Sequence, residues 1–137
     1  MAIKEKRIIL DTNLWISFLI TKDLSKLDKR IFTGETILIF SQELLHEFIS
    51  VVRRPKFKRY FTQKDIIEIL DILDQQTIFV KVTSDIKICR DKKDNFLLSL
   101  AVDGNADFLI TGDQDLLELK EIEKTQIVTL SQYLEVK

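Results

Sequence analysis

The sequence predicts an α/β protein with three α/β/α layers, in which a parallel sheet of about four to five strands carries helices on both faces. Short runs of consecutive apolar, mostly β-branched residues are typical of strands that are buried on both faces. These runs alternate with longer segments in which apolar residues recur at helical spacing. Such alternation is expected when crossover helices join parallel strands.

The first strand and the helix after it define one edge of the expected sheet. Arg7–Leu10 is an apolar run that stops abruptly at Asp11. Thr12 and Asn13 offer N-cap chemistry for a helix that begins near Leu14. Asp11 therefore stands at the carboxyl end of a buried strand, where open α/β sheets bind their ligands.

The remaining elements follow from the same patterns, with Ser, Thr or Asp at helix starts and Gly or Pro near helix ends. The expected strands are 36–40, 77–82, 106–110 and, at the edge of the sheet, 126–130. The expected helices are 24–32, 44–52, 63–73, 94–103, 114–119 and a terminal turn from Ser131.

The composition indicates one globular domain over residues 1–137, because 45% of the residues are hydrophobic and 31% are charged. Only 3 Gly and 1 Pro leave no room for a flexible linker. Neither a membrane-spanning run nor a secretory signal is expected. The single Cys excludes an intramolecular disulfide and a thiolate zinc site, so a cytoplasmic location is expected.

Four carboxylates from separated segments are expected to meet at the carboxyl edge of the sheet. Asp11 ends the first strand, and Asp113 follows the fourth. Glu47 lies near the apolar face of the helix after the second strand, and Asp94 begins the helix before the fourth. Clustered carboxylates are tolerated when a divalent metal is bound or when their pKa values are raised. Hard oxygen ligands favour Mg²⁺ or Mn²⁺, which can activate water for attack on a phosphodiester.

Local details support this site without excluding simpler explanations. Thr111 and Asp115 place a hydroxyl and a further acid beside the end of the fourth strand. Asp91 and Asp94 lie at a helix start, where the helix dipole favours acids. Capping alone would explain either of these two acids, and Asp11 on its own could be a turn residue.

The charge distribution is uneven although the formal net charge is only −1. Residues 53–64 carry six positive charges, no acid and three aromatic side chains, whereas residues 103–123 are rich in acids. This arrangement suits a polyanion held beside a cation site, but two solvated surfaces of opposite sign would explain it as well. The candidates for RNA phosphate contacts are Arg53, Arg54, Lys56, Lys58 and Arg59.

Several stretches of the chain carry a family resemblance, namely Ile9–Asn13, Ser41–Phe48, Arg54–Phe57, Cys89–Leu97, Ala106–Asp113 and Gln114–Leu117. In this order and spacing they resemble the PIN domain family, in particular its bacterial and archaeal toxins of toxin–antitoxin systems, akin to VapC-type ribonucleases. The resemblance implies that Asp11, Glu47, Asp94 and Asp113 form the catalytic metal site, supported by Asn13 and Thr111, with Asp91 and Asp115 as auxiliary acids. It also implies an RNA substrate, a cognate antitoxin and a homodimer.

The leading hypothesis is therefore an Mg²⁺- or Mn²⁺-dependent endoribonuclease that acts on single-stranded or looped RNA. A haloacid-dehalogenase-like phosphatase is the rival enzyme, but that family needs a second Asp where this chain has Asn13. A third hypothesis is a non-catalytic PIN-fold binding module. The intact set of four acids argues against it.

Overall fold

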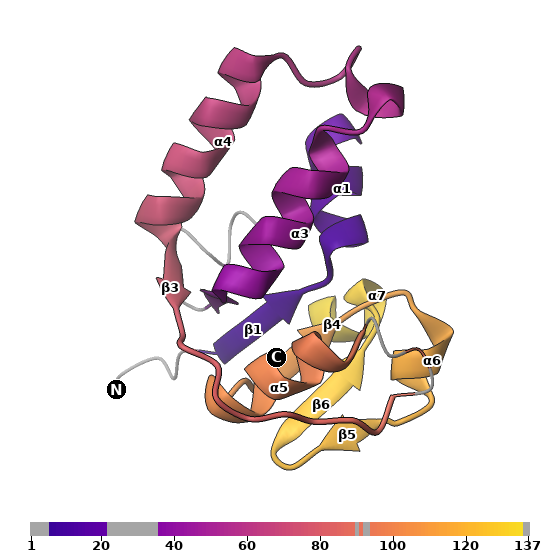
Figure 1. Ribbon diagram of the computed structural model, residues 1–137. Helices are drawn as coiled ribbons and strands as arrows, with labels where there is room; N and C mark the ends of the chain where they lie inside the picture. The colour runs from indigo at the N-terminus through magenta and orange to yellow at the C-terminus, as the bar shows by residue number, and fades with distance from the viewer. Residues whose placement is uncertain (1–5, 22–35, 90, 92–93, 136–137) are drawn as a thin grey trace.

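The computed structural model describes residues 6–21, 36–89, 91 and 94–135. A six-stranded sheet with the order β3-β2-β1-β4-β6-β5 lies at its centre (Figure 1). The strands are β1 (Lys6–Leu10), β2 (Thr36–Phe40), β3 (Thr77–Phe79), β4 (Phe108–Ile110), β5 (Glu121–Ile122) and β6 (Thr125–Val128). Each neighbouring pair is parallel except β5 and β6.

Helices flank this sheet, and Figure 1 shows α5 in front of the strands and α7 behind them. The helices are α1 (Thr12–Thr21), α3 (Gln42–Val52), α4 (Gln63–Gln76), α5 (Asn95–Asp103), α6 (Gln114–Leu117) and α7 (Leu130–Leu134), with a 3₁₀ turn η1 (Pro55–Phe57). The predicted α/β fold, with a mostly parallel sheet and helices on both faces, is confirmed. None of the helices in these described ranges is long and apolar enough to span a membrane.

The centre of the sheet is the best-buried part of the molecule. Ile8 and Ile9 of β1 are inaccessible to solvent, and so is Ile110 of β4. The last helix is joined to the sheet by the Tyr133 hydroxyl, which lies 2.6 Å from the Thr36 hydroxyl oxygen in β2. A firmly packed centre keeps the carboxyl ends of β1 and β4 in fixed positions.

Several predicted boundaries are wrong for identifiable reasons. The first helix begins at Thr12 rather than near Leu14, because the Asp11 carboxylate accepts the Asn13 backbone N–H at 3.3 Å and so starts the helix earlier. The terminal helix begins at Leu130 because Thr129, not Ser131, forms its capping box. The expected strands 77–82 and 106–110 are shorter, and the expected helix 24–32 lies outside the described residues.

Strand β5 is absent from the prediction, and it changes the edge of the sheet. Its hairpin with β6 makes β6 an interior strand, where an edge strand is expected. The residues with positive φ around it are Lys120 (φ 66°) and Glu123 (φ 50°). Hairpins are usually identified by Gly or Asn at such positions, and this one has neither there.

Candidate active site

Asp11 lies at the carboxyl end of β1 and is the first polar group of the site. Its side chain is 8% exposed, and its backbone N–H donates to the Ile110 carbonyl oxygen at 3.0 Å. Its Oδ1 accepts the Asn13 N–H, and its Oδ2 accepts the Thr111 hydroxyl at 2.8 Å. Burial raises the pKa of Asp11, and these hydrogen bonds offset only part of that rise.

Thr111 joins two of the predicted acids. Its buried hydroxyl donates to Asp11 Oδ2 and accepts the backbone N–H of Asp113 at 3.0 Å. Its own N–H donates to the Val128 carbonyl oxygen at 3.0 Å, so β6 holds it in place. Asp113 Oδ1 in turn accepts the Asp115 N–H at 2.8 Å and caps α6. Thr111 therefore orients Asp11 and Asp113 relative to each other.

Asp94 brings a third segment to the same place. Burial raises its pKa to about 7, and the hydrogen bond and charge of Asp113 and the charges of Asp11 and Asp91 add to the effect. Asp94 is the N-cap residue of α5, but its side chain accepts no capping hydrogen bond. Its Oδ2 is buried without a hydrogen-bond partner in the described part of the chain. Capping therefore does not account for this carboxyl group.

Glu47 lies on α3, six residues beyond the N-cap Ser41 and thus about 9 Å along the helix axis. Its side chain is exposed, although Phe48 beside it is fully buried. Among the residues described, no three Asp, Glu, His or Cys side chains form a group that could hold a metal ion as they stand. The structure therefore brings Asp11, Asp94 and Asp113 together, and Glu47 does not complete a preformed metal site with them.

Comparison with known proteins identifies the fold and the family. The PIN domain model matches residues 7–115. The chain belongs to the PIN domain family. This is a nuclease family whose members generally use divalent metal ions.

Two similar proteins extend over most of this PIN domain. The uncharacterised protein MJ1680 of Methanocaldococcus jannaschii is 28% identical over 121 residues, which make up 86% of this chain and 77% of that protein. A chain of VapBC2 from Rickettsia felis, crystallised with a DNA fragment from its promoter, superposes with a TM-score of 0.60 and 16% identity. The match covers 88% of this chain and 96% of that chain, and at this identity it shows the shared fold.

The aspartates of this PIN domain fit a divalent cation by the kind of atom they offer. All are hard carboxylate oxygens, which Mg²⁺ and Mn²⁺ prefer. The raised pKa of Asp94 and its hydrogen bond with Asp113 mean that a proton reduces the repulsion between the two carboxyl groups. A cation would do the same, and the buried Asp94 Oδ2 has no hydrogen-bond partner within the described part of the chain. Some side chains must turn to converge on one ion.

The other predicted supporting residues contribute mainly through their backbones. Asn13 has an exposed side chain, and it contacts the site through its backbone N–H, which Asp11 accepts. The half-buried Asp91 accepts the Asp94 N–H on its carbonyl oxygen at 3.0 Å and adds its charge to the cluster. Asp115 is half-buried and donates its N–H to Asp113.

The acid-rich region 103–123 contains two acids that have structural roles. Asp103 accepts the Thr83 and Ser84 N–H groups and the Ser84 hydroxyl, and these hydrogen bonds hold the pKa of Asp103 below its ordinary value. Asp107 Oδ2 accepts the Arg7 N–H at 2.8 Å. The density of acids in this region therefore overstates the size of the site.

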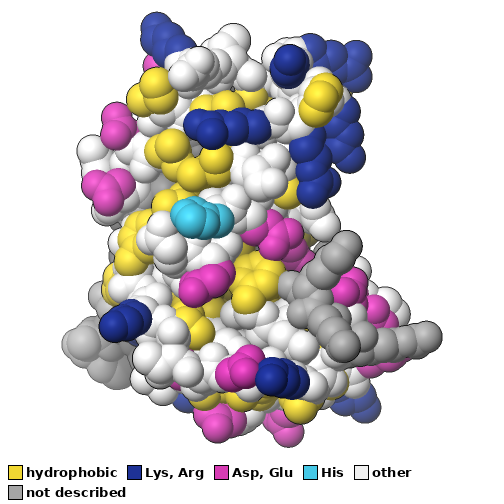
Figure 2. Space-filling view, in the orientation of Figure 1, with side chains coloured by type: hydrophobic (Ala, Val, Ile, Leu, Met, Phe, Trp, Pro, Cys, Tyr) yellow, Lys and Arg dark blue, Asp and Glu magenta, His cyan; other side chains and the backbone are white. Residues whose placement is uncertain are grey.

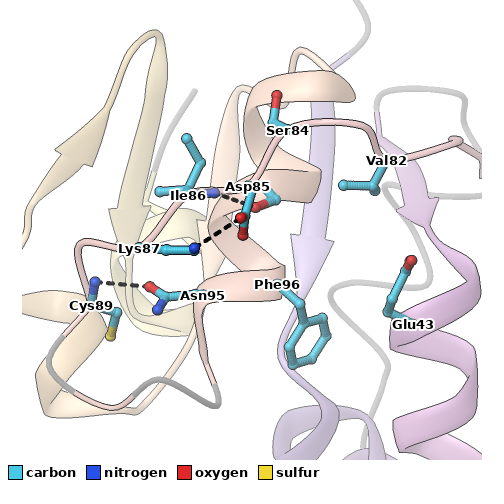
Figure 3. A pocket seen from close by; sticks show the side chains of 10 residues that line it. Glu43, Val82, Ser84, Asp85, Ile86, Lys87, Cys89, Asn95 and Phe96 are labelled. Atoms are coloured by element: carbon cyan, nitrogen blue, oxygen red, sulfur yellow. Dashed lines mark hydrogen bonds and ion pairs between the residues drawn. The ribbon is translucent and has the colours of Figure 1, made fainter.

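A pocket of about 620 Å³ that was not expected from the sequence lies beside the start of α5. Asn95, directly after Asp94, lines it and accepts the Cys89 N–H at 2.9 Å. Figure 3 shows the Phe96 ring between Asn95 and Glu43 of α3. The pocket is formed by α3, α5 and the segment between β3 and α5, so no local sequence signal identifies it. Cys89 is buried, and burial raises the pKa of its thiol, which argues against a nucleophilic role.

The predicted basic residues lie together at the end of α3 and around η1, and all five side chains are exposed. Lys56 Nζ lies 5.1 Å from the centre of the Phe57 ring, and the Arg59 guanidinium lies 4.9 Å from that of Tyr60. Figure 2 shows Lys and Arg side chains gathered over this part of the molecule, with Asp and Glu side chains below them on the same side.

Proposed function

We propose that residues 1–137 form one nuclease domain, an Mg²⁺- or Mn²⁺-dependent endoribonuclease that hydrolyses phosphodiester bonds with metal-activated water. The observation that carries the proposal is the cluster of Asp11, Asp94 and Asp113. These side chains come from three separate segments, and their burial and mutual charge raise the pKa of Asp11 and Asp94. Membership of a nuclease family and the nearby basic residues support the same conclusion.

In the proposed mechanism, the residues that would hold the metal are Asp11, Asp94 and Asp113, with Glu47 of α3 as the fourth ligand. The chemistry that Mg²⁺ or Mn²⁺ would supply there is activation of water and stabilisation of the negative charge on the phosphate. Thr111 and the Asn13 N–H keep Asp11 in its orientation. Asp91 and Asp115 are auxiliary acids that increase the negative charge around the metal ligands.

The proposed substrate is single-stranded or looped RNA, held by the exposed cations Arg53, Arg54, Lys56, Lys58 and Arg59. We further propose that the protein is the toxin of a toxin–antitoxin pair, acts in the cytoplasm as a homodimer and is covered by a cognate antitoxin. The support for this role is the fold shared with VapBC2 of Rickettsia felis.

Substitution of the aspartates tests the nuclease proposal. Asp11→Asn and Asp113→Asn are each expected to lower Mn²⁺-dependent cleavage of a labelled single-stranded RNA by at least about a hundredfold. Asp71→Asn on the exposed surface of α4 is the matched control and should cleave like the wild type. Cleavage at the wild-type rate by either site variant would refute the mechanism. EDTA should abolish cleavage by the wild type.

One observation favours a second candidate, a non-catalytic PIN-fold binding module. The described residues contain no group of side chains that could hold a metal ion without rearrangement. Titration calorimetry with Mn²⁺ separates the two candidates, because the binding module would release or absorb no heat of metal binding. The haloacid-dehalogenase-like phosphatase is disfavoured by Asn13 and by PIN family membership, and a covalent aspartyl-phosphate at Asp11 would restore it.

A further inference from the structure

The end of α3, the turn after η1 and the start of α4 enclose a second pocket, of about 470 Å³. Its floor is apolar and buried, because Val52 is 2% exposed and Phe61 and Ile66 are each 8% exposed. Its rim is formed by the exposed side chains of Arg53, Lys58 and Gln63. The volume lies within the range of pockets that hold small organic ligands.

The two cations on the rim, Arg53 and Lys58, have exposed side chains. The ion pairs seen within the described ranges involve neither Arg53 nor Lys58. Asp65, the acid in the first turn of α4, accepts the Thr62 N–H at 2.9 Å in a capping box. Lys56 lies instead over an aromatic ring. Arg53 and Lys58 are therefore the basic residues that line this pocket and, as far as the described residues are concerned, are free to bind a ligand in it.

We propose that this pocket binds one unpaired nucleotide of the RNA substrate. Its base would rest on the floor of Val52, Phe61 and Ile66, and the phosphates on either side of it would contact Arg53 and Lys58. Proteins recognise single-stranded RNA in this way, by stacking splayed bases on apolar or aromatic side chains while cations follow the backbone. The Gln63 amide at the rim supplies a donor and an acceptor for the edge of a base.

The position of the pocket among the basic residues suits a strand that runs on toward acidic side chains. The basic region and the acids below it lie on the same side of the molecule (Figure 2). A paired base cannot enter the pocket without leaving its helix, so the pocket would make the enzyme prefer unpaired RNA. This inference rests on the proposed ribonuclease function and names the feature that selects its substrate.

The test is a binding measurement that does not depend on cleavage. Fluorescence anisotropy with a labelled 12-nucleotide single-stranded RNA in EDTA compares the wild type with the Arg53→Ala/Lys58→Ala variant. We expect the affinity to fall by about tenfold. The slope of log affinity against log salt concentration should decrease by an amount that corresponds to about one to two phosphate contacts. The matched control is Lys81→Ala/Lys124→Ala, which removes the same charge from exposed sites elsewhere and should change the affinity less than twofold.

Two further RNA probes separate base binding from general electrostatic attraction. A fully paired duplex of the same length should bind the wild type at least about fivefold more weakly, and an abasic strand should show a similar loss. Equal losses in both double variants, or equal affinity for the three RNAs, would overturn the proposal. If the wild type binds no RNA, the proposed function itself fails. If it binds and cleaves RNA but the pocket variant does so equally well, only the nucleotide pocket is refuted.

Discussion

Replacement of Asp94 by Asn should stabilise the metal-free protein and yet weaken its stabilisation by metal. Burial and neighbouring acids raise the pKa of Asp94 from 3.8 to about 7. Between about pH 4 and pH 7 the folded state therefore binds more protons than the unfolded state, and stability falls as the pH rises. Above pH 7 Asp94 is ionised in both states, and the loss of stability has reached its full size. A rise in pKa of about three units corresponds to a loss of at most about 4 kcal/mol in the free energy of unfolding. Because Asp94 is only half-buried, we expect a loss of about 1–2 kcal/mol.

The assay is urea unfolding of the wild type and Asp94→Asn in EDTA at several pH values. The variant should match the wild type near pH 4 and exceed its free energy of unfolding by about 1–2 kcal/mol at pH 8. Added Mn²⁺ should then stabilise the wild type more than the variant. A ligand stabilises a folded protein according to its affinity for it, and the variant has lost one carboxylate ligand. Asp71→Asn, which changes an exposed acid on α4, is the matched control. A variant that is less stable than the wild type at pH 8 would refute the reasoning.

Three other substitutions test contacts seen in the structure. Thr111→Val removes a buried hydroxyl that donates to Asp11 and should cost about 2–3 kcal/mol in urea unfolding, whereas Thr111→Ser should keep most of the stability. Gly104→Ala places a Cβ atom 2.8 Å from a helix carbonyl oxygen and should cost about 1–3 kcal/mol, so an unchanged melting temperature would contradict the close approach. Tyr133→Phe loses the 2.6 Å hydrogen bond to Thr36 and should cost about 1–2 kcal/mol, a loss that Tyr133→Phe/Thr36→Val should partly recover if the partners act as a pair.

The features predicted correctly from the sequence are those that local patterns determine. The apolar runs locate β1 and β2, because strands buried on both faces need consecutive apolar residues. The position of Asp11 at a strand end follows from the same pattern. Its contact with Thr111, 100 residues away, then follows from the parallel pairing of β1 with β4.

The features that the sequence does not reveal depend on contacts between distant segments. The sequence around Asp103 does not distinguish it from the acids of the candidate site, but its carboxylate accepts the backbone N–H groups of residues 83 and 84. The exposure of Glu47 depends on how α3 lies against its neighbours, not on its position in the helix. The nucleotide pocket requires Arg53 and Ile66 to lie on opposite sides of a turn, and their spacing in the sequence carries no signal of this.

The hydrogen bond from the Thr111 N–H to the Val128 carbonyl oxygen affects the order in which the protein can mature during synthesis. Asp11 is made long before Thr111 and β6, which hold it in place. A nascent chain therefore carries its first acid long before the site can assemble. A message cut short before residue 128 yields a polypeptide with Asp11, Asp94 and Asp113 but without the strand that fixes their arrangement. The proposed nuclease activity would therefore have to wait until β6 has been made.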